Sequence, residues 1–242
     1  SVDVHKAASD HCVYMAGQGK HECMAWCGTS SQQTEATLVS WSKSINSRFV
    51  GLAFQDIYKS NSLGVAEWLD PYYTAVMLAA MQASTPVATP LTRKTPNLLS
   101  VRQHPAIKLL DSIEAFLEGG LVTLMPKAVG WWVERSVTTY ALENMVYSEM
   151  SAMESVNTSI RDIRNHLTKV IGTGNVAGTK GNIERITLAR LRAQVSAGTI
   201  KAFNKGSIIA TDLGDSFSVT YTAAPTFPVN FIKLEATFVA TI

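Results

Sequence analysis

The sequence predicts a mixed-sheet α/β domain over residues 1–140, followed by a C-terminal α+β domain over residues 141–242, in which two helices cover a small mixed β-sheet. Helix-like and strand-like apolar runs alternate up to Tyr140, which is typical of α/β folds. A narrow apolar stripe with helical spacing then begins, and the final residues alternate with period two. The change of pattern after Tyr140 indicates a domain boundary.

The first part contains helix and strand signals in alternation. Proline at a first-turn position starts the predicted helices at Pro71 and Pro105, and Gly119 and Gly120 end the second of them. We expect helices over 5–15, 32–45, 71–81 and 105–118, and strands over 22–27, 49–54, 121–125 and 129–137. Three prolines make 84–96 a connecting loop.

The second part opens with apolar residues spaced alternately four and three apart. This spacing predicts one long helix over 142–170, or two helices in line. A glycine-rich turn over 172–181 leads to a second helix over 182–197, with Ile183, Leu188, Leu191 and Val195 facing inward. Alternation over 216–221 and 232–242 predicts strands with one buried face.

The composition excludes several classes of protein. The net charge of +2 is too small for the electrostatic footprint of a nucleic-acid binder. No apolar run reaches the roughly 18 residues that span a bilayer, and no signal peptide is recognisable, so we expect no membrane insertion. Three cysteines, an odd number, favour folding in a reducing cytoplasm over a disulfide scaffold.

No pattern indicates catalysis, and the sequence predicts no catalytic residue, metal ligand or cofactor. Neither glycine-containing stretch, over 14–21 or over 172–181, has the context of a phosphate-binding loop. Soft metal ligands gather near the start, but their spacing matches no paired CxxC site: His5, His11, Cys12, His21, Cys23 and Cys27. A soluble α/β enzyme or ligand-binding protein with an unidentified pocket remains the alternative class.

Residues 151–201 carry a local excess of basic side chains, eight against three acidic ones, a net of 8 − 3 = +5. A solvated helix face is the common meaning of such a run. A docking surface for an acidic partner is the functional interpretation. Its candidate residues are Arg161, Arg164, Arg185, Arg190 and Arg192.

Several segments together resemble the sheath proteins of contractile phage tails. The block 132–139 (WVERSVTT), followed at once by a long helix, is similar to the junction that leads into the C-terminal domain of that family. The order of FVGLAF, DPYY, TPLTRK and the helix that ends before two glycines is also similar, as are LRAQVSAGTI, GDSFSV and PVNFI downstream. Because the outer domains of the family have no counterpart, the chain resembles the inner, C-terminal part of a sheath subunit.

This resemblance implies a virion structural protein, without enzymatic activity, that polymerises around a tail tube and contracts to drive the tube through the host envelope. Its partners would be copies of itself, the tube protein, and the baseplate and tail terminator proteins. It would assemble in the host cytoplasm and reside in the phage tail, with the five arginines as candidates for tube docking.

The terminal segment would link subunits by strand addition to a neighbouring sheet. Its residues are Phe231, Ile232, Lys233, Leu234, Glu235, Ala236, Thr237 and Phe238. The alternative is an internal strand of the same subunit, completed by residues 200–212, in which the run 207–210 (SIIA) could pair locally.

Overall fold

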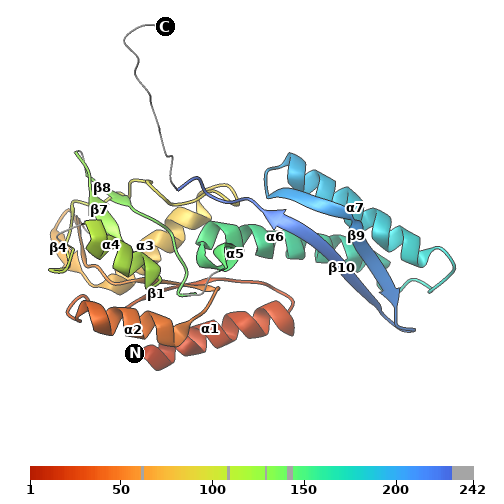
Figure 1. Ribbon diagram of the computed structural model, residues 1–242, viewed down its shortest axis with the longest axis horizontal. Coiled ribbons are helices and arrows are strands. Elements are labelled where there is room, and N and C mark those ends of the chain that lie inside the picture. Colours follow the sequence, from red (N-terminus) through yellow and green to blue (C-terminus); the bar gives the residue numbers. More distant parts are fainter. Residues whose placement is uncertain (61–62, 108–109, 129, 141–143, 231–242) are drawn as a thin grey trace, which may run out of the picture.

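A computed structural model gives a mixed α and β fold, in agreement with the predicted class (Figure 1). It describes residues 1–60, 63–107, 110–128, 130–140 and 144–230. The helices are α1 (Val2–Gly17), α2 (Glu35–Ile45), α3 (Pro71–Ala83), α4 (Leu110–Glu118), α5 (Met145–Ser148), α6 (Met150–Leu167), the short 3-10 helix η1 (Thr168–Val170) and α7 (Thr179–Ser196). The strands are β1 (Ala25–Gly28), β2 (Val50–Ala53), β3 (Ile57–Ser60), β4 (Ala66–Leu69), β5 (Ser100–Val101), β6 (Leu121–Val122), β7 (Leu124–Pro126), β8 (Trp131–Val133), β9 (Ile200–Asp212) and β10 (Phe217–Pro225).

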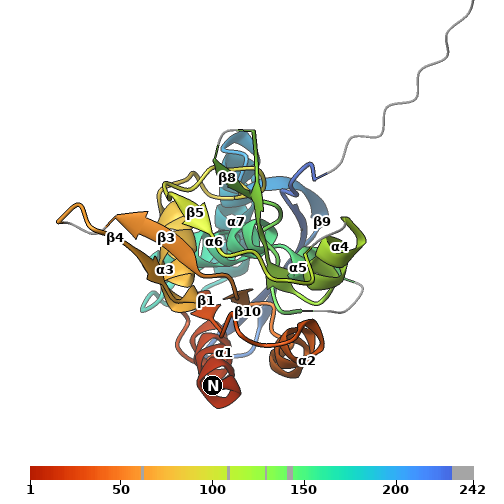
Figure 2. The same cartoon turned by 90° about the vertical axis from the view of Figure 1, so that its left-hand side faces the viewer.

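A parallel sheet in the order β1-β2-β6 forms the centre of the first part, residues 1–140. Every residue of β2 is buried, because one apolar cluster with α3 lies on one side and a second cluster with α2 and α4 lies on the other. Ala53 belongs to the first cluster, and Val50 and Leu52 belong to the second. A strand buried on both faces explains the continuous apolar run in the sequence. Figure 2 shows α1 and α2 side by side below β1.

Glycine is required where α3 begins against β1. A Cβ on Gly28 would lie 2.3 Å from both the backbone nitrogen and the Cα of Tyr72, which leaves no room for a side chain. This close approach lets α3 pack against β1 and β2. The predicted helix over 71–81 is confirmed, with two further residues at its end.

Small antiparallel pairs flank the parallel sheet, and β3, β4 and β5 were not predicted. β3 pairs with both β4 and β5, and β7 pairs with β8. The single strand predicted over 121–125 is wrong, because β6 lies in the parallel sheet and β7 in an antiparallel pair. The chain passes from one sheet to the other at Thr123. The Gln55 side chain binds the next residue there: its Oε1 accepts from the backbone nitrogen of Leu124 at 2.6 Å, and its Nε2 donates to the carbonyl of Leu124 at 3.0 Å.

The helix predicted from Pro105 begins later, at Leu110. The residues around Pro105 form a turn instead, in which the backbone nitrogen of Ile107 donates to the carbonyl of His104 at 2.9 Å. The imidazole Nδ1 of His104 also accepts a bond from the backbone nitrogen of Ala106 at 3.2 Å. These bonds fix a turn that a proline signal alone cannot distinguish from a first helical turn.

The apolar stripe after residue 140 corresponds to two helices in line, α5 and α6, which meet at Glu149. Glu149 is extended because its backbone bridges to Val137, while the backbone nitrogen of Met150 donates to the carbonyl of Ser136 at 3.0 Å. The first of the two alternatives in the sequence, one continuous helix, is thereby wrong. The domain boundary expected at residue 140 adjoins residues outside the described ranges and stays a prediction.

The rest of the second part consists of α6 and α7 with the antiparallel pair β9-β10 (Figure 1). Within the described ranges this sheet has two antiparallel strands, so the expected mixed sheet is not found there. β10 shows the predicted alternation, whereas β9 extends far beyond the run 207–210, and its burial follows no period of two. The predicted strand over 232–242 lies outside the described residues.

The buried face of α7 differs from the predicted one. Ile183 and Leu191 are buried as expected, but Thr187 and Gln194 take the places expected for Leu188 and Val195. Both polar groups are satisfied: Thr187 Oγ1 donates to the carbonyl of Ile183 at 2.9 Å, and Gln194 Nε2 donates to the carbonyl of Ser159 at 3.2 Å. Hydrogen bonding therefore outweighs the apolar pattern.

No helix in the described part of the chain is long and apolar enough to cross a membrane.

Candidate assembly surface

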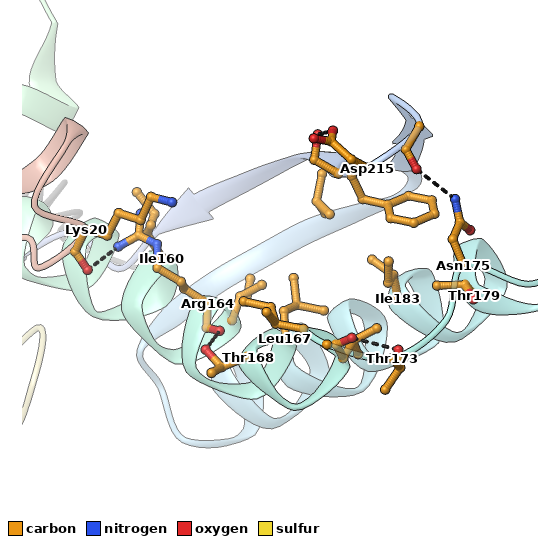
Figure 3. A pocket seen from close by; sticks show the side chains of 18 of the residues that line it. Lys20, Ile160, Arg164, Leu167, Thr168, Thr173, Asn175, Thr179, Ile183 and Asp215 are labelled. Atoms are coloured by element: carbon orange, nitrogen blue, oxygen red, sulfur yellow. Dashed lines mark hydrogen bonds between the residues drawn. The ribbon is translucent and has the colours of Figure 1, made fainter.

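A large hollow of about 860 Å³ lies between α6, the turn after it, the start of α7 and the tip of the β9-β10 hairpin. Figure 3 shows Leu167 and Ile183 between the two helices and the hairpin. The lining is mainly apolar, from Ile160, Ile163, Leu167, Val170, Ile171, Ile183, Phe217, Val219 and Tyr221. The geometry is that of a groove that receives apolar side chains.

The apolar stripe of the sequence lines this groove. Ile163 is buried, but Ile160, Leu167 and Val170 from the same stripe are only half-buried. A second hollow of about 370 Å³ shares Ile160, Val219 and Tyr221 with the first, so the two form one trough between α6 and β10. The stripe is thus a partly covered surface, which the spacing alone could not distinguish from a closed core.

The strand β10 presents alternate residues to the trough. Phe217, Val219 and Tyr221 are half-buried, and Ser218 and Thr220 between them are exposed. In the described residues β10 pairs with β9 alone. An edge of this kind offers main-chain groups to a further strand.

Two of the candidate arginines on α6 are held by the segment before β1. Arg161 donates to the backbone carbonyl of Glu22 at 2.7 Å. Arg164 forms an ion pair with the carboxylate of Glu22 at 2.7 Å and donates to the carbonyl of Lys20 at 2.7 Å (Figure 3). These two side chains fasten α6 to the first part of the molecule.

Arg190 on α7 is also paired within the chain. Its guanidinium makes a bidentate contact with the Asp162 carboxylate on α6, in which Nε donates to Oδ2 at 3.1 Å and Nη2 donates to Oδ1 at 2.8 Å. Burial raises the pKa of the Asp162 carboxyl, but Arg190 and the amide of Gln194 outweigh that effect, and the net pKa is below the usual value. The pair joins α6 to α7.

The remaining two candidates, Arg185 and Arg192, are exposed on α7. They are seven residues apart, so they share one face of the helix. Arg185 donates to Asn182 Oδ1 in its own helix at 3.0 Å. The five candidates therefore do not form one exposed basic surface; three are bound between segments of the chain and two face solvent.

The described chain ends at Asn230, which is held by residues from both parts of the molecule. Asn230 Nδ2 donates to Glu149 Oε1 at 2.8 Å, and Thr92 Oγ1 donates to Asn230 Oδ1 at 3.3 Å. Glu149 is buried and is paired with Arg135, whose Nε donates to the same oxygen at 3.2 Å. Burial raises the pKa of the Glu149 carboxyl, and Arg135 and Asn230 oppose this rise. The predicted inter-subunit residues 231–238 follow this anchor and lie outside the described residues.

Sequence reasoning missed this anchor. Glu149 falls at the four-and-three spacing of the apolar stripe over 142–170, although a carboxylate at a buried position needs a cationic partner. Arg135, fourteen residues earlier, is the partner. A carboxylate in an otherwise apolar stripe is thus the sequence signal for a buried ion pair, but the sequence does not show which basic residue is its partner.

A further hollow of about 640 Å³ lies near the carboxyl ends of β1 and β2, where α/β enzymes commonly bind ligands. Several of its polar side chains are occupied with backbone groups. Gln55 and Gln103 both donate to the carbonyl of Leu124, and His104 Nε2 lies 2.8 Å from the carbonyl of Gln33. Among the described residues no group of three His, Cys, Asp or Glu side chains could hold a metal ion.

Comparison with known proteins adds to this geometry. No model of a protein family matches the sequence. The tail sheath protein of Bacillus phage SP01 is 24% identical over 239 residues, which are 98% of this chain and 41% of the phage protein. The sheath tail protein of Desulfitobacterium hafniense has a TM-score of 0.74 at 12% identity, over 94% of this chain and 51% of that one. This chain has the fold of the tail sheath proteins.

The same fold is found in an assembled sheath. The helical sheath of the anti-feeding prophage in its contracted state matches 98% of this chain and 66% of its own, with a TM-score of 0.68 and 14% identity. The resemblance inferred from the sequence is thereby confirmed at the level of the fold. The chain spans about half the length, or less, of the phage and Desulfitobacterium relatives it matches.

Proposed function

We propose that this protein is a structural, non-enzymatic subunit of a contractile tail sheath, which polymerises around a tail tube and contracts. The observation that carries the proposal is the match of nearly the whole chain to sheath proteins, one of them from a phage and one in a contracted helical sheath. The same likeness supports a virion location in the phage tail, and we propose that the subunit assembles there from the host cytoplasm. Tube, baseplate and tail terminator proteins are the partners that such a role requires.

The trough between α6 and β10 supports assembly from copies of this chain. β9 packs against α7 and β10 contacts α6, so the edge of β10 that no described strand pairs with lies on the side of α6. Two packed helices present a face roughly 20 Å wide, since their axes lie about 8–10 Å apart and each is about 10 Å across. Two strands about 4.8 Å apart cover only about half of that width. A further strand beside β10 would cover the half-buried residues Ile160 and Leu167.

The segment 231–238 of a neighbouring subunit is the strand that we propose for this place. Its even-numbered residues Ile232, Leu234, Ala236 and Phe238 are apolar, so one face suits the stripe of α6. Eight residues in extended form reach about 26 Å, which is comparable to the length of β10. Backbone hydrogen bonds would link the subunits while the apolar alternation fixes the register.

The anchor at Asn230 favours a neighbour over the same subunit. β10 runs from the hairpin tip toward Asn230, which is bonded to Thr92 of the first part and to Glu149 where α5 meets α6. To return along β10 in its own subunit, the chain would have to reverse directly at that anchored residue. Extension away from the anchor, toward another subunit, needs no such reversal.

Electron microscopy of the purified protein, alone and with its tube protein, tests the general proposal. Tubes or rings are expected. A monodisperse monomer that assembles in neither condition contradicts a sheath role and returns the enzyme or ligand-binding class to consideration.

Two matched substitutions test the strand. Leu234→Asp on the apolar face should prevent polymerisation, whereas Lys233→Asp on the polar face should permit it. Both variants, and a truncation that lacks residues 231–242, should melt as the parent does. Unfolding of the truncated protein would instead assign the segment to the core of its own subunit.

We further propose that the arginines of α6 and α7 contribute to tube docking in two ways. Arg185 and Arg192, which are exposed, would contact the tube directly, which requires acidic side chains on the tube surface that they meet. Arg161, Arg164 and Arg190 are paired within the chain, and they would act by holding α6 and α7 in place.

A further inference from the structure

Two thiols from different segments are in contact inside the first part of the molecule. Cys12 lies on the buried face of α1, and Cys23 lies in the segment that leads into β1. The Cys23 thiol donates to Cys12 Sγ, with the sulfur atoms 3.6 Å apart. Cys12 is 2% exposed and Cys23 is half-buried, and both are free thiols.

The surroundings hold the two segments close together. Cys12 belongs to an apolar cluster with Phe49 and Met153, and Cys23 packs against the same cluster. The chain turns between them at Lys20, which has a φ of 54°. Glu22, next to Cys23, is paired with an arginine of α6. The Cys23 segment is therefore fixed against α6 while its sulfur touches α1.

We propose that Cys12 and Cys23 are a redox site that forms a reversible disulfide with small disulfides such as oxidised glutathione as the oxidant. A disulfide bond is about 2.05 Å long, so the sulfur atoms must approach by roughly 1.5 Å from their contact of 3.6 Å. Rotation of the half-buried Cys23 side chain can supply much of that movement. This inference does not depend on the proposed sheath function.

The order of the two steps follows from exposure and burial. The Cys23 thiolate attacks one sulfur of oxidised glutathione, forms a mixed disulfide and releases one glutathione thiolate, which takes up a proton from water. The Cys12 sulfur then attacks Cys23 Sγ, loses its proton and displaces the second glutathione, which leaves as the thiol. The products are one protein disulfide and two reduced glutathione molecules, so two protein thiols are oxidised and one small disulfide is reduced.

Cys12 is suited to the second step and not to the first. Burial is the main cause that raises the pKa of the Cys12 thiol to about 12, and repulsion of a thiolate by the nearby sulfur atoms of Cys23 and Cys27 adds to the rise. A thiol with so high a pKa is a poor nucleophile at neutral pH. We expect the closing step to be slow and to accelerate at alkaline pH.

The bond would tie α1 to the segment before β1, and through Glu22 to α6. α1 is otherwise attached near this place by contacts such as Ser9 to Ser47, at 2.7 Å. In a reducing compartment the pair stays as two thiols, and in an oxidising medium it closes. The same chain would thus be stiffer in an oxidising medium than in a reducing one.

Oxidation of the purified chain in buffers of graded oxidised and reduced glutathione tests the proposal. Peptide mapping without reduction should find Cys12 linked to Cys23, with Cys27 still free. The melting temperature should rise by roughly 5–10 °C, because a short loop is closed in the unfolded chain. Dithiothreitol should reverse both changes.

Three variants complete the test. Cys23→Ser and Cys12→Ala should each abolish the oxidative rise in melting temperature, whereas Cys27→Ser, the matched control, should keep it. Should Cys12→Ala fail to fold, Cys23→Ser carries the comparison, since its side chain is half-buried. Three free thiols at full oxidation, a stable mixed disulfide on Cys23, or a bond to Cys27 would each overturn the proposal.

Discussion

The strands β2 and β10 differ in how completely the chain covers them. Every residue of β2 is buried, between two apolar clusters supplied by helices of the same chain. In β10 half-buried and exposed residues alternate, and a trough separates the strand from α6. The first region is closed by its own helices, and the second has an apolar surface that the described residues leave partly open. The second region is therefore the place that we propose for contact between copies.

The two regions also use different contacts in their interiors. In the first, Phe54 stacks on Phe116 with ring centres 4.8 Å apart. In the second, polar groups join the helices: Ser159 Oγ donates to Gln194 Oε1 at 2.6 Å, and Arg190 pairs with Asp162. These hydrogen bonds and the ion pair fix the orientation of α6 relative to α7. Each contributes only modestly to the free energy of unfolding, because it replaces hydrogen bonds to water.

The largest effect is expected from Phe54→Ala in the closed core. Phe54 is fully buried, so the substitution removes its packing and leaves a cavity, at a cost of about 3–5 kcal/mol in the free energy of unfolding. Urea denaturation measures the change. Phe227→Ala is the matched control, because Phe227 is 38% exposed, and equal losses in the two variants would contradict the contrast between the regions.

A smaller effect, and a contrast within one helix, is expected from two isoleucines of α6. Ile163→Ala should cost roughly 2–4 kcal/mol, because Ile163 is buried against Leu191 and Ile200. Ile160→Ala should cost less than about 1 kcal/mol in the monomer but should weaken polymerisation, since Ile160 lines the open trough. Thermal melting and electron microscopy separate the two effects. A closed core across the whole stripe would instead give two similar losses of stability.

The pH dependence of stability should change when Glu149, where the two regions join, is replaced by Gln. The folded pKa of Glu149 lies above its unfolded value of 4.5, so the folded state binds more protons between these values and stability falls as pH rises through that window. Glu149→Gln removes this dependence, and it retains an oxygen that accepts from Arg135 and Asn230. Urea midpoints between about pH 3 and pH 7 measure it.

Asp162 provides a control of opposite sign. Its folded pKa is below the unfolded value of 3.8, so its contribution is present above that pH and is lost as pH falls through the folded pKa. Asp162→Asn should therefore be less sensitive to acid than the parent. If stability changed with pH by the same slope in Glu149→Gln and Asp162→Asn, neither the Glu149 pair nor the Asp162 pair would act as the geometry indicates.

The smallest effect on stability is expected from the exposed arginines of α7. Replacing Arg185 and Arg192 with Glu should change the free energy of unfolding by no more than about 0.5 kcal/mol, because both side chains face solvent. Binding to tubes should weaken, and binding of the parent should fall as salt rises. Cosedimentation with tubes measures the binding. A variant that carries both Lys201→Glu and Lys205→Glu is the control for the change of net charge. Unchanged binding would identify Arg185 and Arg192 as an ordinary solvated face.

The sequence by itself determined the elements whose signals are local. The apolar run of β2, the alternation of β10 and the helix from Pro71 are each written in consecutive residues, so their periodicity is enough. The order of these segments also carried the likeness to sheath proteins, which the fold confirms. The sequence did not predict the short strands β3, β4 and β5, because their pairing depends on partners elsewhere in the chain.

Only the tertiary structure decided which residues meet. The pairing of Arg135 with Glu149, the binding of two α6 arginines near Glu22, and the contact of Cys12 with Cys23 all join positions that lie apart in the chain. The burial of polar residues on α7 was decided in the same way, by their hydrogen bonds. A pattern in one segment gives the direction in which a side chain faces, but the partner that satisfies it is fixed only when the segments pack.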